Sequence, residues 1–122
     1  MNNKESFIKN RLKSIGYASK GAIILLKTES SIQIQFVIAI IVTTLGFYFN
    51  ISNSEWMMQM FAIGLIITAE GLNTAIEKMA DFIHPEHHKK IGFIKDIAAG
   101  AVFIAALTAI IVGLIIYLPK IF

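Results

Sequence analysis

The sequence predicts an all-α integral membrane protein: a single domain over residues 1–122, with three transmembrane helices and an N-terminal amphipathic surface helix. Hydrophobic residues make up 56% of the 122 residues and charged residues only 16%, against about 25% charged in an average soluble domain. A domain this small has too much surface to hide so much apolar material from water. The apolar content also excludes intrinsic disorder, and the lack of cysteine excludes a disulfide scaffold.

Three long apolar stretches account for this composition. A bilayer core about 30 Å thick requires about 20 apolar residues in a helix, and we place the transmembrane helices at residues 32–49, 56–76 and 97–118. Because lipid offers the backbone no hydrogen-bond partners, these segments are expected to be helical despite their many β-branched residues. The alternative, a soluble bundle of buried helices, would leave almost no polar residues for a surface.

The positive charges predict how the chain crosses the membrane. All but one of the 11 Lys and Arg residues either precede the first apolar stretch or lie in the predicted cytoplasmic loop at residues 78–96, and the exception is Lys120. By the positive-inside rule, the N-terminus is expected in the cytoplasm and the C-terminus outside. The polar segment Met1–Ser6 predicts no cleavable signal peptide.

Residues 1–30 predict an amphipathic helix that lies in the cytoplasmic membrane interface. Small or apolar residues recur about every 3.6 residues, and four lysines populate the other side. The first set is Ile8, Leu12, Ile15, Ser19, Ala22, Ile23 and Leu26, and the second is Lys9, Lys13, Lys20 and Lys27. A transit presequence or a simple charged tail remains the alternative.

A polar stripe continues from the second apolar stretch. Glu70, Asn73, Glu77 and Asp81 are spaced i, i+3, i+7 and i+11, which places them on one face of a helix. Polar groups at a membrane boundary are costly and usually functional. Glu70 is expected near the cytoplasmic edge of the hydrocarbon, where partial removal from water suits a carboxylate to accept a proton.

Further polar residues are expected at the same membrane face, before or at the start of the first and third stretches: Glu29, Gln33, Gln35, Lys95 and Asp96. Two carboxylates and a lysine form a possible site for a metal-bound phosphate compound. Mg²⁺ takes one or two carboxylates and completes its coordination with water and phosphate oxygens, and lysine neutralises phosphate charge. A structural alternative stays open, in which Glu77 pairs with Lys78 or Lys95 and Asp96 caps the third helix.

Several common sites are absent from the sequence. It contains no P-loop, no kinase G-x-G-x-x-G pattern and no nucleophilic serine motif. His84, His87 and His88 lie beside Pro85 without the spacing of zinc ligands. Trp56, Tyr117 and Tyr48 are expected to form an aromatic belt at the outer interface, without a role in chemistry.

Five longer segments of this sequence resemble a known family of membrane proteins. They are Gly16-Tyr-Ala-Ser-Lys-Gly21, Lys27-Thr-Glu-Ser-Ser30, Glu70-Gly-Leu-Asn-Thr-Ala-Ile-Glu77, His84-Pro-Glu-His-His88 and Lys95-Asp-Ile-Ala-Ala-Gly-Ala101. Together they resemble the small bacterial membrane kinases that include diacylglycerol kinase and undecaprenol kinase. The resemblance covers nearly the whole chain, and the third and fifth segments are highly specific as a pair.

This resemblance implies a homotrimer in the bacterial cytoplasmic (inner) membrane that transfers the γ-phosphoryl group of Mg-ATP to the hydroxyl of a lipid alcohol. Mg²⁺ is the implied cofactor, and the implied partners are the lipid alcohol, ATP, the bilayer and other copies of the chain, with no nucleic acid. Glu70 would be the general base, and Asn73 would help to place Glu70 and the phosphate. Glu29 and Glu77 would hold magnesium.

The resemblance also implies two sets of substrate contacts. The nucleotide would contact Tyr17, Glu29, Glu77, Glu86, His88, Lys95 and Asp96. The lipid substrate would contact Lys20, Gln33, Gln35, Glu70 and Ala99.

Departures from the family pattern leave the lipid open. Some members have an arginine where Asn10 stands, and the adjacent Arg11 is the candidate replacement. Gln35 and the Ala-Ala-Gly-Ala run favour the undecaprenol branch over the diacylglycerol branch. A second functional hypothesis is a small membrane transport or proton-conducting subunit that uses Glu70, and a third is a scaffold without chemistry. Small residues along one side of the third stretch permit close packing, either between copies or within one chain.

Overall fold

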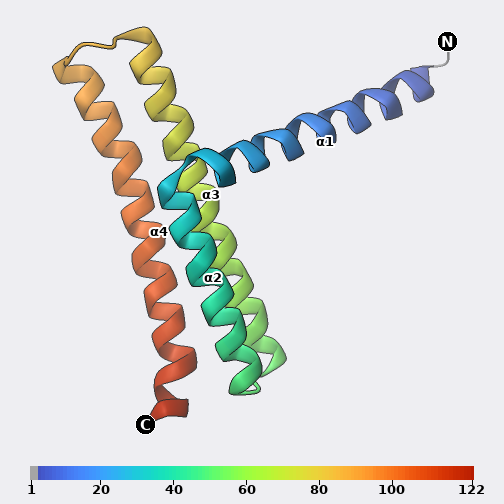
Figure 1. Cartoon of the computed structure of the whole chain (residues 1–122), viewed down its shortest axis with the longest axis vertical. Coiled ribbons are helices and arrows are strands. Elements are labelled where there is room, and N and C mark those ends of the chain that lie inside the picture. The colour runs from blue at the N-terminus through green and yellow to red at the C-terminus, as the bar shows by residue number, and fades with distance from the viewer. Residues whose placement is uncertain (1–2) are drawn as a thin grey trace.

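The structure is a computed structural model that describes residues 3–122. These residues form four α-helices: α1 (Asn3–Thr28), α2 (Ser30–Tyr48), α3 (Asn53–Ile83) and α4 (Lys89–Ile121). Helices α2, α3 and α4 are each long and apolar enough to cross a membrane, which confirms the predicted all-α membrane fold. Figure 1 shows these three helices packed along one another, while α1 leaves the bundle at a steep angle.

The connection between α3 and α4 is shorter than predicted. Helix α3 runs to Ile83 and α4 begins at Lys89, so the expected loop at residues 78–96 is mostly helical and the connection itself is residues 84–88. The sequence prediction ended the second membrane segment at residue 76, before Glu77, and began the third at residue 97, after Asp96. A helix in water tolerates charged side chains, so both helices continue past the apolar stretches into a polar extension.

Packing and capping explain why these extensions are helical. Ala80 and Ala98 are only 4% and 7% exposed, and such small side chains allow close helix contact beyond the apolar stretches. At the start of α4, the His88 side chain accepts a hydrogen bond from the Lys90 backbone N–H, with Nδ1 and N 3.1 Å apart. Asp96 therefore lies inside α4 and does not cap it.

A tight turn joins α2 to α3. Asn50 has a positive φ of 51°, a conformation that asparagine tolerates better than most residues. The Ile51 N–H donates to the Gly46 carbonyl at 3.1 Å, which closes the end of α2 as in a Schellman motif. Ser52 and Glu55 then exchange side-chain and backbone hydrogen bonds in a capping box. The turn consumes few residues, so α2 and α3 lie antiparallel and adjacent.

Three residues form a polar contact inside the apolar bundle that was not predicted. Tyr117, expected in the aromatic belt, is only 8% exposed, and Gln59 is 4% exposed. The Tyr117 hydroxyl lies 2.5 Å from Gln59 Oε1, and Gln59 Nε2 donates to the Val42 carbonyl at 3.2 Å. The contact joins α2, α3 and α4, because buried polar groups must find partners where water is absent.

Replacing Tyr117 with Phe is expected to lower the stability of the folded protein by about 1 kcal/mol, because Gln59 Oε1 loses its buried donor. The measurement is reversible unfolding in detergent micelles. Tyr48→Phe is the matched control, since Tyr48 is 80% exposed, and it should unfold like the wild type. Equal stability of both variants would show that the hydroxyl contributes nothing to bundle stability.

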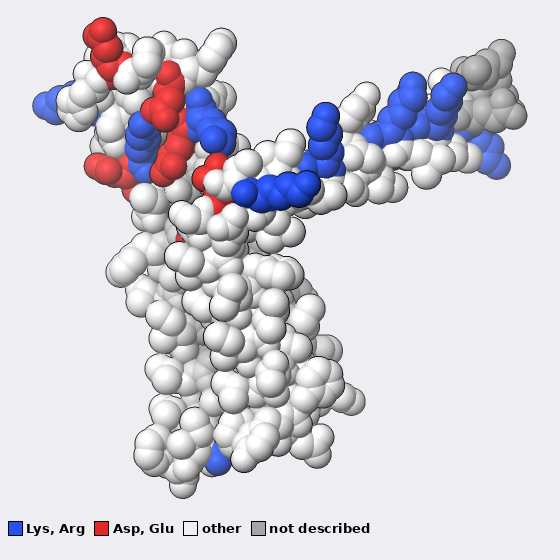
Figure 2. Space-filling model, in the orientation of Figure 1, with Lys and Arg blue, Asp and Glu red and all other residues white. Residues whose placement is uncertain are grey.

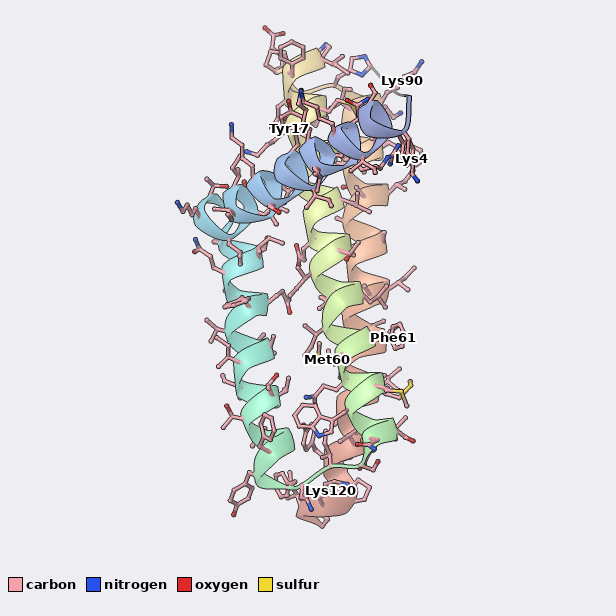
Figure 3. The ribbon with its side chains drawn as sticks, turned by 90° about the vertical axis from the view of Figure 1, so that its right-hand side faces the viewer. Lys4, Tyr17, Met60, Phe61, Lys90 and Lys120 are labelled. Carbon is pink, nitrogen blue, oxygen red and sulfur yellow. The ribbon has the colours of Figure 1, made fainter. Side chains whose placement is uncertain are left out.

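Charged residues gather at one end of the molecule. Figure 2 shows acidic and basic side chains on α1 and on the loop-proximal ends of α3 and α4, while the visible face of the remaining bundle is almost entirely uncharged. Lys120 lies at the opposite end from Lys4, Tyr17 and Lys90 (Figure 3), where it pairs with Glu55 at 2.9 Å. The uncharged body between the two ends is the part of the fold suited to the hydrocarbon of a bilayer.

Candidate functional site

The predicted polar stripe lies along the part of α3 that leads from the uncharged body into the charged end. Glu70 is half-buried and Glu77 is exposed. Asn73 Nδ2 donates to Glu77 Oε1 at 3.1 Å, one helical turn away. Asn73 was expected to help place Glu70, but the hydrogen bond that the structure contains goes to Glu77. The first two carboxylates of the stripe thus differ in burial, and Asn73 holds the more exposed one, Glu77.

The side-chain amide oxygen of Asn73 has no hydrogen-bond partner among the described residues. This Oδ1 atom is buried. A buried acceptor without a partner is uncommon in proteins and calls for an explanation such as an ion, a ligand or a water. Asn73 therefore offers an unused oxygen beside Glu77.

Glu29 reaches the same helix from the junction of α1 and α2. It is the single non-helical residue between them, with φ −105° and ψ 114°. Its Oε1 lies 3.3 Å from Lys78 Nζ, which is the neighbour of Glu77 in the chain. Glu29 is 24% exposed at its side chain and Lys78 is 69% exposed. The junction therefore holds one carboxylate against α3 through the exposed cation of Lys78.

The two predicted lipid-contacting glutamines have different surroundings. Gln33 Nε2 donates to the carbonyls of Leu26 and Lys27 at 3.0 and 3.2 Å, so it caps the end of α1. Gln35 lines a largely apolar cavity of about 90 Å³ between α2, α3 and α4, together with Gln59 and other residues. The Gln33 amide thus serves to cap α1, whereas Gln35 lines a cavity within the bundle.

Lys95 is held across the α3–α4 connection by an acidic partner. Its Nζ lies 2.5 Å from Asp81 Oδ1, which is the last member of the α3 stripe. Lys95 also lines a cavity of about 250 Å³ in the connection, shared with His84, Glu86 and His88. The predicted nucleotide residues Glu86, His88 and Lys95 therefore meet in one hollow, as their spacing alone could not establish.

Neither of the suggested ion pairs of Glu77 forms. Lys78 turns to Glu29, and Lys95 turns to Asp81, which leaves Glu77 with Asn73 as its hydrogen-bond partner. The structural alternative that Glu77 serves only to neutralise a nearby lysine therefore finds no support among the described side chains. Its carboxylate is available at the surface.

The remaining predicted site residues do not join this group within one chain. Tyr17 is 74% exposed and lies on α1 (Figure 3), which leaves the bundle in Figure 1. Lys20 is also exposed on α1, and Asp96 and Ala99 are exposed on α4. The end of α1 does come close to the stripe in the same chain, since a Cβ at Gly71 would lie 3.2 Å from Leu25 Cδ1, whereas Tyr17 and Lys20 lie earlier on that helix.

The donor set fits magnesium better than zinc. Among residues 3–122, no three or more His, Cys, Asp and Glu side chains form a group that could hold a metal ion alone. Mg²⁺ does not require one, because it binds through one or two carboxylates and completes its coordination with water and substrate phosphates. The exposed Glu77 carboxylate would supply hard oxygen atoms of the kind that such an ion prefers.

One functional pairing was missed from the sequence. Asp81 was recognised as part of the stripe, but its contact with Lys95 was not, because the predicted loop at residues 78–96 left their relative position undefined. The available signal was an acidic and a basic residue on either side of a short Pro-containing connection. Gln59 also had a signal, since it is an uncharged polar residue inside an apolar stretch.

Comparisons with known proteins place this arrangement in context. A sequence model described as prokaryotic diacylglycerol kinase matches residues 16–117. An undecaprenol kinase of Bacillus subtilis (strain 168) is 40% identical over 108 residues, which is 88% of either chain. A diacylglycerol kinase of Escherichia coli (strain K12) is 27% identical over 82% of either chain. A diacylglycerol kinase of Haemophilus influenzae is 28% identical over 84% of this chain and 86% of its own.

Proposed function

This chain belongs to the prokaryotic diacylglycerol kinase family, and we propose that it is a lipid kinase that transfers the γ-phosphoryl group of Mg-ATP to a membrane lipid alcohol. The reaction takes place at the cytoplasmic surface of the bacterial inner membrane. In this orientation the N-terminus and the α3–α4 connection are cytoplasmic, and the C-terminus is outside.

The observation that carries the proposal is the position of the α3 stripe. Glu70 is half-buried and directly follows the charge-free segment 56–69 of α3, whereas Glu77 and Asp81 are exposed further along the helix. A lipid alcohol can therefore bring its hydroxyl to this depth without leaving the bilayer. Extraction would cost about 0.8 kcal/mol for each CH₂ group exposed to water. A water-soluble phosphate donor reaches the same place from the other side.

The roles follow from depth and chemistry. Phosphoryl transfer depends mainly on positioning and charge neutralisation. Glu70, nearest the hydrocarbon, accepts the proton of the lipid hydroxyl, and Lys95 donates to phosphate oxygens. Glu77 and Glu29 would hold the magnesium ion, which neutralises phosphate charge when bound. Asn73 fixes the Glu77 carboxylate through its amide N–H.

Undecaprenol is the substrate that we favour over diacylglycerol. The supporting observation is identity to relatives, which is 40% to the undecaprenol kinase against 27% to the E. coli diacylglycerol kinase. Gln35 and the Ala-Ala-Gly-Ala run on α4 point the same way. Both lipids present a primary hydroxyl at headgroup depth, so the site chemistry is the same for either.

The assembly is proposed to be a homotrimer, with α1 lying in the membrane interface. Large apolar side chains on α1 such as Leu12 and Ile15 are 65% and 62% exposed, and an amphipathic helix at a bilayer surface would bury them in lipid. Tyr17 and Lys20 are exposed on α1, the helix that leaves the bundle in Figure 1. Neighbouring copies would supply such residues to the site.

The transport hypothesis has less support. A proton-conducting subunit would be expected to place carboxylates near the middle of its membrane helices. The apolar parts of α2 and α4, residues 32–48 and 97–118, contain none, and in α3 Glu70 comes only after the charge-free stretch 56–69. The family to which the chain belongs consists of kinases by description.

The proposal is tested with purified protein in mixed micelles that contain ATP labelled in the γ-phosphate. We expect labelled lipid phosphate to form in the presence of Mg²⁺ and not with a chelator in excess. Undecaprenol and diacylglycerol, each at the same mole fraction, should be compared side by side, with undecaprenol expected to give the higher kcat/KM. Absence of lipid phosphate with either alcohol would refute the proposed function, and a preference for diacylglycerol would refute only the substrate assignment.

A further inference from the structure

Asp81 and Lys95 form one of two ion pairs that join α3 to α4. Their atoms Oδ1 and Nζ are 2.5 Å apart, and the side chains are 61% and 36% exposed. The other pair, Lys120 with Glu55 at 2.9 Å, lies at the opposite end of the same two helices. Exposed ion pairs generally contribute little to stability. Holding α3 against α4 is therefore a weak explanation for the Asp81–Lys95 pair.

A positional explanation fits the surroundings better. Lys95 lines the cavity of about 250 Å³ in the α3–α4 connection, and that cavity also contains side chains of Glu86 and His88. A lysine has four flexible carbon–carbon bonds and can direct its ammonium group to many places. Asp81 restricts this freedom, because its Oδ1 accepts a hydrogen bond from the Lys95 ammonium group.

The contact leaves Lys95 able to bind a second anion. An ammonium group has three N–H donors, and Asp81 uses one of them. The other donors remain for phosphate oxygens, so Lys95 need not leave Asp81 when a nucleotide binds. The pair also neutralises Asp81, whose uncompensated charge would otherwise repel the phosphates.

From this geometry we propose that Asp81 is a positioning residue that holds the Lys95 ammonium group at the loop cavity, where it meets the phosphates of the nucleotide. Asp81 acts through Lys95 and does not touch the substrate itself. This inference rests on the proposed kinase function. It adds a role for the outermost residue of the α3 stripe, four residues beyond Glu77.

The test compares Asp81→Asn, Asp81→Glu and Lys120→Met in the full chain, with ATP as the probe. Asp81→Asn should lower kcat/KM for ATP by about 10- to 100-fold, as expected for a displaced positioning contact. Most of the change should appear in KM. Asp81→Glu restores the charge and should recover part of the loss. Lys120→Met breaks the other α3–α4 ion pair and should leave both constants unchanged.

Thermal unfolding of the same variants separates positioning from structure. Asp81→Asn should melt within a few degrees of the wild type, because the pair is exposed. Wild-type kinetic constants for Asp81→Asn would overturn the inference, and so would a comparable loss in Lys120→Met. If the wild type itself phosphorylates no lipid, the proposed function fails first; an active wild type with an unaffected Asp81→Asn overturns the positioning role alone.

Discussion

Replacing Glu70 with Gln is expected to lower kcat by about 10²- to 10⁴-fold, the usual contribution of a general base, while nucleotide binding survives. Glutamine keeps the shape of the side chain but cannot accept the proton of the lipid hydroxyl. Glu70 takes part in none of the three ion pairs found among the described residues, so its replacement removes a chemical group rather than a structural link. The measurement is the steady-state rate with saturating lipid and Mg-ATP.

Two further variants make this prediction specific. Glu70→Asp keeps a carboxylate on a shorter side chain and should retain more activity than Glu70→Gln. Glu55→Gln removes a carboxylate from the other end of α3, far from the stripe, and should keep a kcat close to that of the wild type. Turnover in Glu70→Gln within a few fold of the wild type would remove Glu70 from the role of base.

Replacing Glu77 with Gln is expected to raise the Mg²⁺ concentration required for half-maximal activity and to weaken binding of Mg-ATP. We expect an effect of about 10- to 100-fold, comparable to the loss of other groups that support a bound metal. The amide oxygen of glutamine can still accept the hydrogen bond from Asn73 Nδ2, so mainly the negative charge is lost. Titration of the rate with Mg²⁺ at fixed ATP provides the measurement.

Binding of ATP in the presence and absence of Mg²⁺ gives the control for this variant. A metal ligand should matter only when the metal is present, so Glu77→Gln should bind free ATP as well as or better than the wild type. An unchanged magnesium requirement, or an equal loss of affinity with and without the ion, would contradict the assignment of Glu77 as a metal ligand.

The helical framework could be predicted because membrane helices obey a simple constraint. A backbone in lipid must satisfy its own hydrogen bonds, so length and hydropathy suffice to locate a span. The polar extensions obey no such rule. Their helicity depends on packing at Ala80 and Ala98 and on a histidine cap at the start of α4, which hydropathy does not register.

The site was predictable along one helix but not between helices. Helical periodicity placed Glu70, Asn73, Glu77 and Asp81 on one face, since positions within a helix are fixed by geometry. The contacts that cross between elements depend on connection length and helix direction. Gln33 donates to the last carbonyls of α1 and Lys95 contacts Asp81, and periodicity can indicate neither contact.

Glu29, the single residue between α1 and α2, affects both the direction of α1 and the position of a carboxylate beside α3. The backbone torsions of Glu29 set the direction of the cationic helix α1 relative to α2. Gln33 donates to carbonyls in the last turn of α1 and so fixes that turn beside Glu29. The carboxylate of the same residue rests against α3 through Lys78. The position of the Glu29 carboxylate and the direction of α1 are therefore coupled. A rotation of α1 about this residue would therefore displace the Glu29 carboxylate, which we propose as a magnesium ligand, and a ligand that held this carboxylate would restrict the direction of α1.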